Sequence, residues 1–305
     1  MEEIMENGIL IRDVETKNIM TKSTLPVGGY SVNPYVGCTH GCRYCYASFM
    51  KRFTGHTEPW GMFLDVKHWP EIKNPQKYKG QRVVIGSVTD GYLPQEEQLG
   101  NTRKLLEQLK DSGAEILICT KSDLVVRDID LLKEMGKVTV SWSINTLDER
   151  FQADMDKAAN ISRRLDAMKQ VYDAGIRTVC FIAPVFPGIT DFEAIFQRVK
   201  DQCDLVWLEN LNLRGGFKKD IMEYIQDNYP RLVPLYEAIY NKKDRSYFKL
   251  LEEKAEQMAR QNGCPFVDNE LPYGRAEPGH PVIVDYFYHE EVRGSDNTGR
   301  RIRKK

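Results

Sequence analysis

The 305-residue sequence lacks any segment that would carry it into or across a membrane. No apolar run approaches the roughly 20 residues that span a bilayer. The first ten residues, MEEIMENGIL, are acidic and lack the cationic start and apolar centre of a signal peptide. We therefore expect a cytoplasmic protein with no membrane partner, in a compartment where thiols stay reduced.

The sequence also lacks an excess of charge of either sign. Lysine and arginine number 43 against 44 aspartate and glutamate, so the formal net charge is -1. Nothing in this balance marks the whole chain as a nucleic-acid binder, although a local basic groove would be hidden in such a sum. With 41% hydrophobic residues, the chain has enough apolar material for a globular fold of one large domain or two small ones.

A fourth cysteine is missing from the one tight cysteine group. Cys38, Cys42 and Cys45 lie within eight residues, and the next cysteine is Cys119. The odd total of seven cysteines argues against a disulfide framework. A structural zinc site usually pairs two cysteine knuckles, and no second knuckle follows, although His40 or His56 would offer a fourth ligand. A [4Fe–4S] cluster normally takes four cysteines, so three would leave one iron open to an outside ligand.

Repeats of fixed sequence and low-complexity tracts are absent too, but strand and helix patterns alternate about six times. Strands that are apolar on both faces and alternate with helices predict a parallel sheet curling toward a barrel. A full eight-fold barrel needs about 250 residues, and the alternation stops near Arg214. The candidate strands are Ser31–Val36, Arg82–Val88, Glu115–Thr120, Lys137–Ser143, Arg177–Ala183 and Asp204–Glu209.

The predicted fold class is therefore α/β, a partial (β/α)6 TIM-like barrel with a C-terminal helical extension. We expect an N-terminal extension over residues 1–30, the partial barrel over 31–215, and a helical extension with a tail over 216–305. The tail holds one strand-like run, PVIVDYFY, and ends in the basic residues GRRIRKK, which are typical of a solvated terminus.

The spacing C-x3-C-x2-C, with Tyr44 before the last cysteine, resembles the signature of the radical S-adenosylmethionine (SAM) superfamily. The resemblance implies that Cys38, Cys42 and Cys45 hold a [4Fe–4S] cluster whose fourth iron binds the amino and carboxylate groups of SAM. One electron then cleaves SAM and yields a 5'-deoxyadenosyl radical that abstracts a substrate hydrogen. The resemblance also implies an electron donor such as flavodoxin or ferredoxin, and the partial barrel is that superfamily's fold. The alternative is a non-catalytic iron–sulfur or zinc protein that acts as a scaffold.

Polar residues follow the predicted strands, at the end of the sheet where parallel barrels gather their active groups. We expect Asp90 to accept a hydrogen bond from the methionyl ammonium, with a turn or helix cap as its alternative role. Arg164 would pair with the carboxylate, unless it is a surface arginine. Ile182 and Pro184 would wall the adenine. The remaining expected SAM contacts are Tyr44, Ser87, Thr89, Lys121, Ser143 and Asn145.

The Thr-Asp pair at 89–90, TKS at 120–122 and the SxN at 143–145 narrow the resemblance to the spore photoproduct lyase-related branch. The segments NPYVGCTHGCRYCY and LVWLENLNLRG resemble a narrower bacterial group, the radical SAM mobile pair proteins. That group implies a second radical SAM protein as partner. One departure is Val88, which stands where spore photoproduct lyases carry a hydrogen-donating cysteine. Cys264, in a loop after the last helix, is the remaining candidate thiol, since Cys119, Cys180 and Cys203 suit a core.

Candidate substrate groups lie in two places. The segment 48–69 interleaves basic and aromatic side chains, which suits a nucleotide or nucleic acid, although most of these rings also suit packing onto the barrel. At the end of the sixth strand, a row of polar residues would bind substrate or anchor the loop. This row consists of Glu209, Asn210, Asn212 and Arg214.

Overall fold

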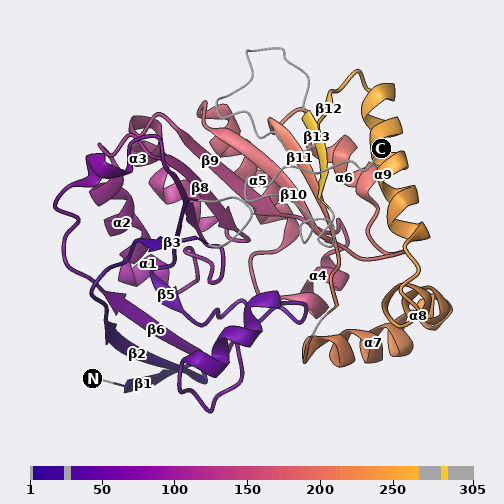
Figure 1. Ribbon diagram of the computed structural model, residues 1–305, viewed down its shortest axis with the longest axis horizontal. Coiled ribbons are helices and arrows are strands. Elements are labelled where there is room, and N and C mark those ends of the chain that lie inside the picture. The colour runs from indigo at the N-terminus through magenta and orange to yellow at the C-terminus, as the bar shows by residue number, and fades with distance from the viewer. Residues whose placement is uncertain (1–2, 24–28, 214, 268–282, 288–305) are drawn as a thin grey trace.

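The computed structural model describes residues 3–23, 29–213, 215–267 and 283–287, and its main feature is a nine-stranded sheet (Figure 1). The strand order is β12-β13-β11-β10-β9-β8-β7-β4-β3. Every neighbouring pair is parallel except β3 and β4. The strands are β3 (Thr21–Lys22), β4 (Tyr30–Val32), β7 (Arg82–Ile85), β8 (Glu115–Thr120), β9 (Val138–Ser143), β10 (Arg177–Val185), β11 (Leu205–Asn210), β12 (Phe266–Val267) and β13 (Ile283–Phe287).

The predicted α/β partial barrel is confirmed. From β4 to β11 the strands lie side by side in the order in which they follow one another in the chain. Strand β7 ends at Ile85, earlier than predicted, because Gly86 adopts a φ of +87°. A Cβ on Gly86 would lie 2.2 Å from the carbonyl oxygen of Cys119, so only glycine fits there.

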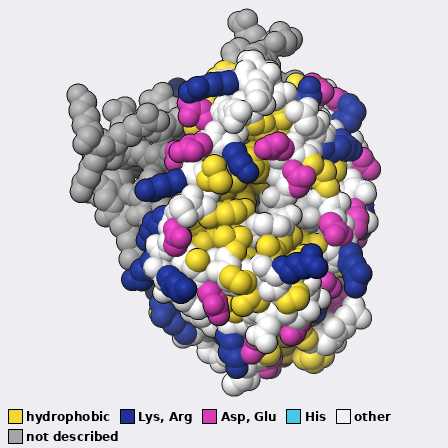
Figure 2. Space-filling view, turned by 90° about the vertical axis from the view of Figure 1, so that its right-hand side faces the viewer, with side chains coloured by type: hydrophobic (Ala, Val, Ile, Leu, Met, Phe, Trp, Pro, Cys, Tyr) yellow, Lys and Arg dark blue, Asp and Glu magenta, His cyan; other side chains and the backbone are white. Residues whose placement is uncertain are grey.

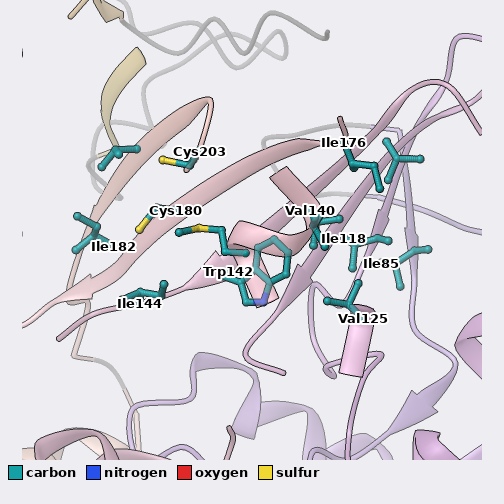
Figure 3. Packing of buried hydrophobic residues seen from close by; sticks show 14 of the residues in the cluster. Ile85, Ile118, Val125, Val140, Trp142, Ile144, Ile176, Cys180, Ile182 and Cys203 are labelled. Atoms are coloured by element: carbon teal, nitrogen blue, oxygen red, sulfur yellow. The ribbon is translucent and has the colours of Figure 1, made fainter. Parts of the chain in front are cut away.

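Helices cover one face of the main sheet and bury its core. Along each strand, alternate side chains point into this core, among them Val140 on β9 and Ile182 on β10 (Figure 3). The helical elements are η1 (Tyr46–Phe53), η2 (Pro75–Tyr78), α1 (Glu96–Leu99), α2 (Asn101–Leu109), η3 (Leu124–Asp128), α3 (Ile129–Glu134), α4 (Glu149–Met155), α5 (Ile161–Asp173), α6 (Phe192–Val199), α7 (Phe217–Asn228), η4 (Pro230–Leu232), α8 (Val233–Tyr240) and α9 (Ser246–Gln261).

The predicted first strand, Ser31–Val36, divides at Pro34. Residues before it pair with β7, and residues after it form β5 (Tyr35–Val36) in a second sheet. Proline has no N–H to continue a ladder, whereas its carbonyl accepts from the Lys67 N–H at 3.1 Å. The second sheet has the order β1-β2-β6-β5, with β1 (Glu3–Glu6), β2 (Ile9–Glu15) and β6 (Phe63–His68), so the N-terminal residues pair with the segment after the cysteines.

The C-terminal part supplies helices, as predicted from its pattern, and also two strands of the main sheet. Strand β13 pairs in parallel with β11, and β12 pairs with β13. The predicted boundary of the barrel at residue 215 stays a prediction, since strands from both sides of it join one sheet.

Figure 2 shows hydrophobic side chains gathered between charged ones on the face beside α8 and α9, where Leu250 is exposed. Within the described ranges, no helix has the length and apolar character needed to cross a bilayer.

Candidate functional site

The three clustered cysteines lie in the loop between β5 and η1. The loop begins at Gly37, whose φ of +87° and close approach to β6 exclude a side chain: a Cβ would lie 2.3 Å from the Phe63 carbonyl oxygen. Burial, followed by Asp90 and Cys45, raises the pKa of Cys38 to about 12. Burial likewise raises the pKa of Cys42 well above its usual value, with the other two cysteines adding to it. The thiols are therefore protonated at neutral pH, and binding a metal there would release protons.

The turn between α4 and α5 holds this loop in place. The Arg43 N–H donates to the Met155 carbonyl at 2.9 Å, and the Lys157 N–H donates to the His40 carbonyl at 2.8 Å. Arg43 also forms an ion pair with Asp220 on α7. The loop is thus fixed to elements more than 100 residues away in the chain.

Asp90 fixes the other side of the loop. Its buried carboxylate contacts His40 Nε2 at 3.1 Å and accepts from the Thr120 hydroxyl at 2.9 Å. It also accepts from the backbone N–H of Tyr92 and of Lys121. Burial alone would raise the pKa of Asp90, but His40 and these hydrogen bonds bring it below its usual value. The carboxylate thus joins the cysteine loop to the end of β8, and the contact with Tyr92 matches the expected turn role. A contact with SAM stays a prediction.

Lys121 lies inside the site, beside the cysteine loop. Its Nζ is 5.8 Å from the centre of the Tyr44 ring. Burial alone would lower the pKa of Lys121, but Cys42 and Asp156 outweigh it and raise that pKa. The ammonium is therefore charged at neutral pH, close to where a cysteine-bound group and an anionic ligand would sit.

Asn145 and Ser143 stand at the end of β9. Asn145 is 1% exposed, and neither its side-chain nitrogen nor its side-chain oxygen has a hydrogen-bond partner. Such an orphaned amide is costly unless a ligand supplies the partners. The backbone carbonyl of Ser143 accepts from Arg164 at 3.1 Å.

Arg164 is a buried arginine and not a surface one, with 0% exposure. Its guanidinium donates to the Ala159 carbonyl, to the Ser143 carbonyl and to the Asp156 carboxylate. These contacts give it a structural role, and a SAM carboxylate would have to share its remaining donors. Its predicted contact with SAM is untested.

The other expected SAM contacts lie in different surroundings. The Ser87 hydroxyl contacts the Ser31 hydroxyl at 2.5 Å, and the Thr89 N–H donates to Asn33 at 3.3 Å. Ile182 packs in the helix-covered core, whereas Pro184 is half-buried two residues further along β10. For all four residues, a contact with SAM stays a prediction.

Sequence reasoning missed the aromatic pair on the sheet face opposite the helices. Phe181 on β10 and Trp207 on β11 are register partners whose rings stack, with centroids 4.7 Å apart. Two residues beyond Trp207, Glu209 raises the pKa of both Cys119 and Tyr46, although burial is the larger cause. The signal was in the sequence: the residues that alternate with the core positions of each strand must face the other side.

Cys264 does not reach the site. It packs against the core under the helices, and Lys200 after α6 is the charge that acts on its pKa. The expectation that Cys264 would serve the mouth of the barrel is therefore contradicted. Cys119 was predicted to lie in the core because of its strand position, but it is partly exposed on the sheet face opposite the helices.

The possible zinc ligands have other partners. His56 lies in the loop between η1 and β6 and is buried against the second sheet, where it contacts Asp65 at 2.8 Å, Arg12 at 3.0 Å and Glu58 at 3.1 Å. Among the described residues, no three His, Cys, Asp or Glu side chains are grouped tightly enough to hold one metal ion. In a [4Fe–4S] cluster each cysteine binds a different iron, so the thiols stand further apart than the ligands of one ion. With His40 paired to Asp90 and His56 to Asp65, the three thiols fit a [4Fe–4S] cluster with one open iron.

The basic and aromatic segment after the cysteines divides into packed and exposed side chains. His56, Phe63 and Trp69 are buried, as loop packing predicts. On η1, Phe49 and Phe53 are 48% and 66% exposed, and the Arg52 guanidinium lies over both rings. Asn210 at the end of β11 is buried. Arg214 and the basic terminus lie outside the described residues.

Comparison with known sequences identifies relatives over most of the chain. The profile of the Radical SAM superfamily matches residues 32–199. An uncharacterized protein of Methanocaldococcus jannaschii is 33% identical over 240 residues, covering 78% of this chain and 90% of that protein. An uncharacterized protein of Acidianus two-tailed virus is 35% identical over 219 residues, covering 65% of this chain and 71% of that protein.

Among solved structures, a spore photoproduct lyase variant with bound AdoMet and dinucleoside spore photoproduct superposes with a TM-score of 0.53. The two chains are 19% identical, and the match covers 72% of this chain and 66% of the lyase. This chain therefore spans slightly less than two thirds of the lyase, and the likeness concerns the fold alone.

Proposed function

Because the chain belongs to the radical SAM superfamily, we propose that it is an enzyme that binds a [4Fe–4S] cluster through Cys38, Cys42 and Cys45 and cleaves SAM reductively. One observation carries the proposal: the loop that holds Cys38, which is buried, and Cys42 and Cys45, which are partly buried, is linked through Asp156 and Arg164 to the end of β9, where the amide of Asn145 is buried without hydrogen-bond partners. When bound, the reduced cluster supplies the electron that splits SAM into a radical able to abstract hydrogen.

The chain's own residues would bind and orient the two cofactors. The cysteines bind the cluster as thiolates, and the Lys121 ammonium offsets part of the negative charge that gathers there. The Asn145 amide nitrogen can donate to a carboxylate or a ribose hydroxyl, and its oxygen can accept from a ribose hydroxyl, which would satisfy its side chain. Asp90 keeps the loop against β8, so the cysteines do not shift as ligands arrive.

For the substrate we propose a nucleobase, alone or in a nucleic acid. Spore photoproduct lyase, with the same fold, is known with a bound dinucleoside. In this chain the ring of Phe181 stacks on that of Trp207 on one neighbouring strand. On the other neighbouring strand, β9, the register partner of Phe181 is the small residue Ser143. A planar base placed over Ser143 would therefore extend the stack of rings. The exposed rings of Phe49 and Phe53 with Arg52 offer a second contact for a strand of bases.

The enzyme proposal is tested by anaerobic reconstitution with iron and sulfide, reduction by dithionite and chromatography for 5'-deoxyadenosine. We expect turnover of SAM to 5'-deoxyadenosine in the parent protein and none in Cys42→Ala, which lacks a cluster ligand. A flavodoxin or ferredoxin should replace dithionite. A cluster-loaded parent that forms no more product than Cys42→Ala would refute the proposal.

Two further measurements separate the alternatives. One zinc per chain without acid-labile sulfide would favour the scaffold protein over the enzyme. Binding of single- and double-stranded DNA over a range of salt concentrations tests the substrate class, because phosphate contacts give a steep salt slope. No binding of DNA or of free nucleosides at low salt would exclude a nucleobase. A second radical SAM protein as partner stays a prediction from the mobile pair resemblance.

A further inference from the structure

Asp156 lies in the turn between α4 and α5, directly behind the cysteine loop, and its side chain is fully buried. A buried carboxylate needs a counter-charge and several hydrogen-bond donors to be tolerated. Asp156 belongs to the segment DMDKAAN, which matches no motif, so the sequence pattern does not point to it.

The two oxygens of Asp156 reach in different directions. Oδ2 accepts from the hydroxyl of Tyr44 at 3.2 Å. Oδ1 accepts from the Arg164 guanidinium at 2.5 Å, from the Gln152 amide at 2.8 Å and from the backbone N–H of Ala158 at 3.1 Å. One oxygen of the carboxylate is therefore bound by side chains of α4 and α5, and the other oxygen binds Tyr44 of the cysteine loop.

Each of its two main partners continues to one half of the site. Tyr44 stands between Cys42 and Cys45, and the edge of its ring packs against Phe186 with centroids 5.6 Å apart. Arg164 donates onward to the carbonyl of Ser143, two residues before Asn145. The chain Tyr44–Asp156–Arg164–Ser143 thus links the cysteine loop to the end of β9 through direct contacts.

From this arrangement we propose that Asp156 is a positioning residue for SAM. It fixes the distance between the cysteine loop and the end of β9, so that a ligand on the open iron also meets Ser143 and Asn145. The inference rests on the proposed function and adds to it the residue that aligns its two halves. Asp156 itself need not touch SAM.

The test is the response of the reduced cluster to SAM, followed by electron paramagnetic resonance of the holoprotein. In Asp156→Asn the amide still accepts from Tyr44 but no longer pairs with the Arg164 charge. We expect this variant to have the iron and sulfide contents of the parent and the same spectrum without SAM. It should need a SAM concentration about 10-fold or more above that of the parent to reach half of the spectral change. The rate of SAM cleavage at saturation should fall less than the apparent affinity.

Two more variants keep the proposal testable if Asp156→Asn does not fold. Tyr44→Phe removes only the hydroxyl that Asp156 accepts from, and should weaken the response to SAM in the same direction. Asp154→Asn is the matched control, because Asp154 lies two residues away and contacts Tyr224 on α7 at 2.8 Å instead; its response should equal the parent's.

Three outcomes would overturn the role. The role is refuted if the Asp156→Asn and Tyr44→Phe proteins both respond to SAM as the parent does. It is also refuted if the response of the Asp154→Asn protein to SAM is weakened as much as theirs. A parent whose cluster loads but never responds to SAM would remove the proposed function, and this role with it. A parent that responds while both variants match it leaves the proposed function intact and removes only the role of Asp156.

Discussion

At the scale of one residue, the proposed binding role of Asn145 conflicts with stability. Its side chain is buried, and no protein group forms a hydrogen bond with its amide nitrogen or oxygen. Native proteins seldom leave such groups without partners, because each costs about 1–3 kcal/mol. We therefore predict that a ligand contacts the amide.

Replacing Asn145 by leucine, which has nearly the same size, should raise the free energy of unfolding of the protein without SAM by about 1–2 kcal/mol. The same change should abolish the response of the cluster to SAM. Both are measured on one preparation, by urea denaturation and by titration with SAM.

The matched control for this change is Asn101→Leu. Asn101 is also buried, but its amide donates to the Lys67 carbonyl at 3.0 Å, so its loss should destabilise the protein by about 1 kcal/mol. An Asn145→Leu protein that loses as much stability as Asn101→Leu would show that the amide has a structural partner.

The site could be predicted from the sequence where a residue belongs to a motif or ends a strand. Cys38, Lys121 and Asn145 are predicted in this way, and the structure places Lys121 beside the cysteine loop. Asp156 could not be selected, because its role comes from a contact between residues 112 positions apart in the chain. The burial of Arg164 was also not predictable, since an arginine on an amphipathic helix normally faces water.

At the scale of elements, Glu149 connects two helices that support the site. It lies in the first turn of α4, and its carboxylate accepts from the backbone N–H groups of Ile161 and Ser162 at 2.8 Å. These are the first N–H groups of α5, which otherwise lack partners and favour a negative charge. Burial is the largest single effect and opposes the charge, but the hydrogen bonds from Ile161 and Ser162 together outweigh it and lower the pKa of Glu149.

Since the folded state lowers this pKa, the stabilisation is complete above the ordinary glutamate pKa of about 4.3 and is lost as the pH falls through the lower folded value. Glu149→Gln should therefore cost about 1 kcal/mol of unfolding free energy at pH 7, at the low end because the group is partly exposed. The difference from the parent should shrink as the pH falls below about 4.3.

Urea denaturation of parent and variant at pH 7, 5, 4 and 3 measures this difference. Glu193→Gln, an exposed glutamate in the first turn of α6, is the control and should differ little from the parent at any pH. A Glu149→Gln deficit that is as large at pH 3 as at pH 7 would contradict the assignment.

At the scale of the whole molecule, the order of the central strands was predictable because each strand follows its neighbour in the chain. Right-handed β-α-β units leave little freedom for another order. The pairing of residues 9–15 with residues 63–68, and of β13 with β11, was not predictable. Such pairings depend on which sheet edge remains open after the central strands have formed, and no local pattern encodes that.

The proposed function also predicts a change in the stability of the whole protein. SAM at 100 times its dissociation constant should stabilise the cluster-loaded protein by about 2.7 kcal/mol, because it binds only the folded state. The melting temperature in Cys42→Ala should not change at the same SAM concentration. Differential scanning fluorimetry under anaerobic conditions measures both, and equal shifts in the two proteins would show that SAM binds without the cluster.

The position of β13 between β11 and β12 has a consequence for biosynthesis. As the chain leaves the ribosome, strands β4 to β11 emerge in the order in which they pair, so the sheet can grow one strand at a time. Strand β12 emerges next, yet its only sheet partner, within the described residues, is β13, which is made later. The edge of β11 therefore stays unpaired until residue 287 has been synthesised. If the ribosome stalls earlier, that edge is accessible to chaperones and proteases.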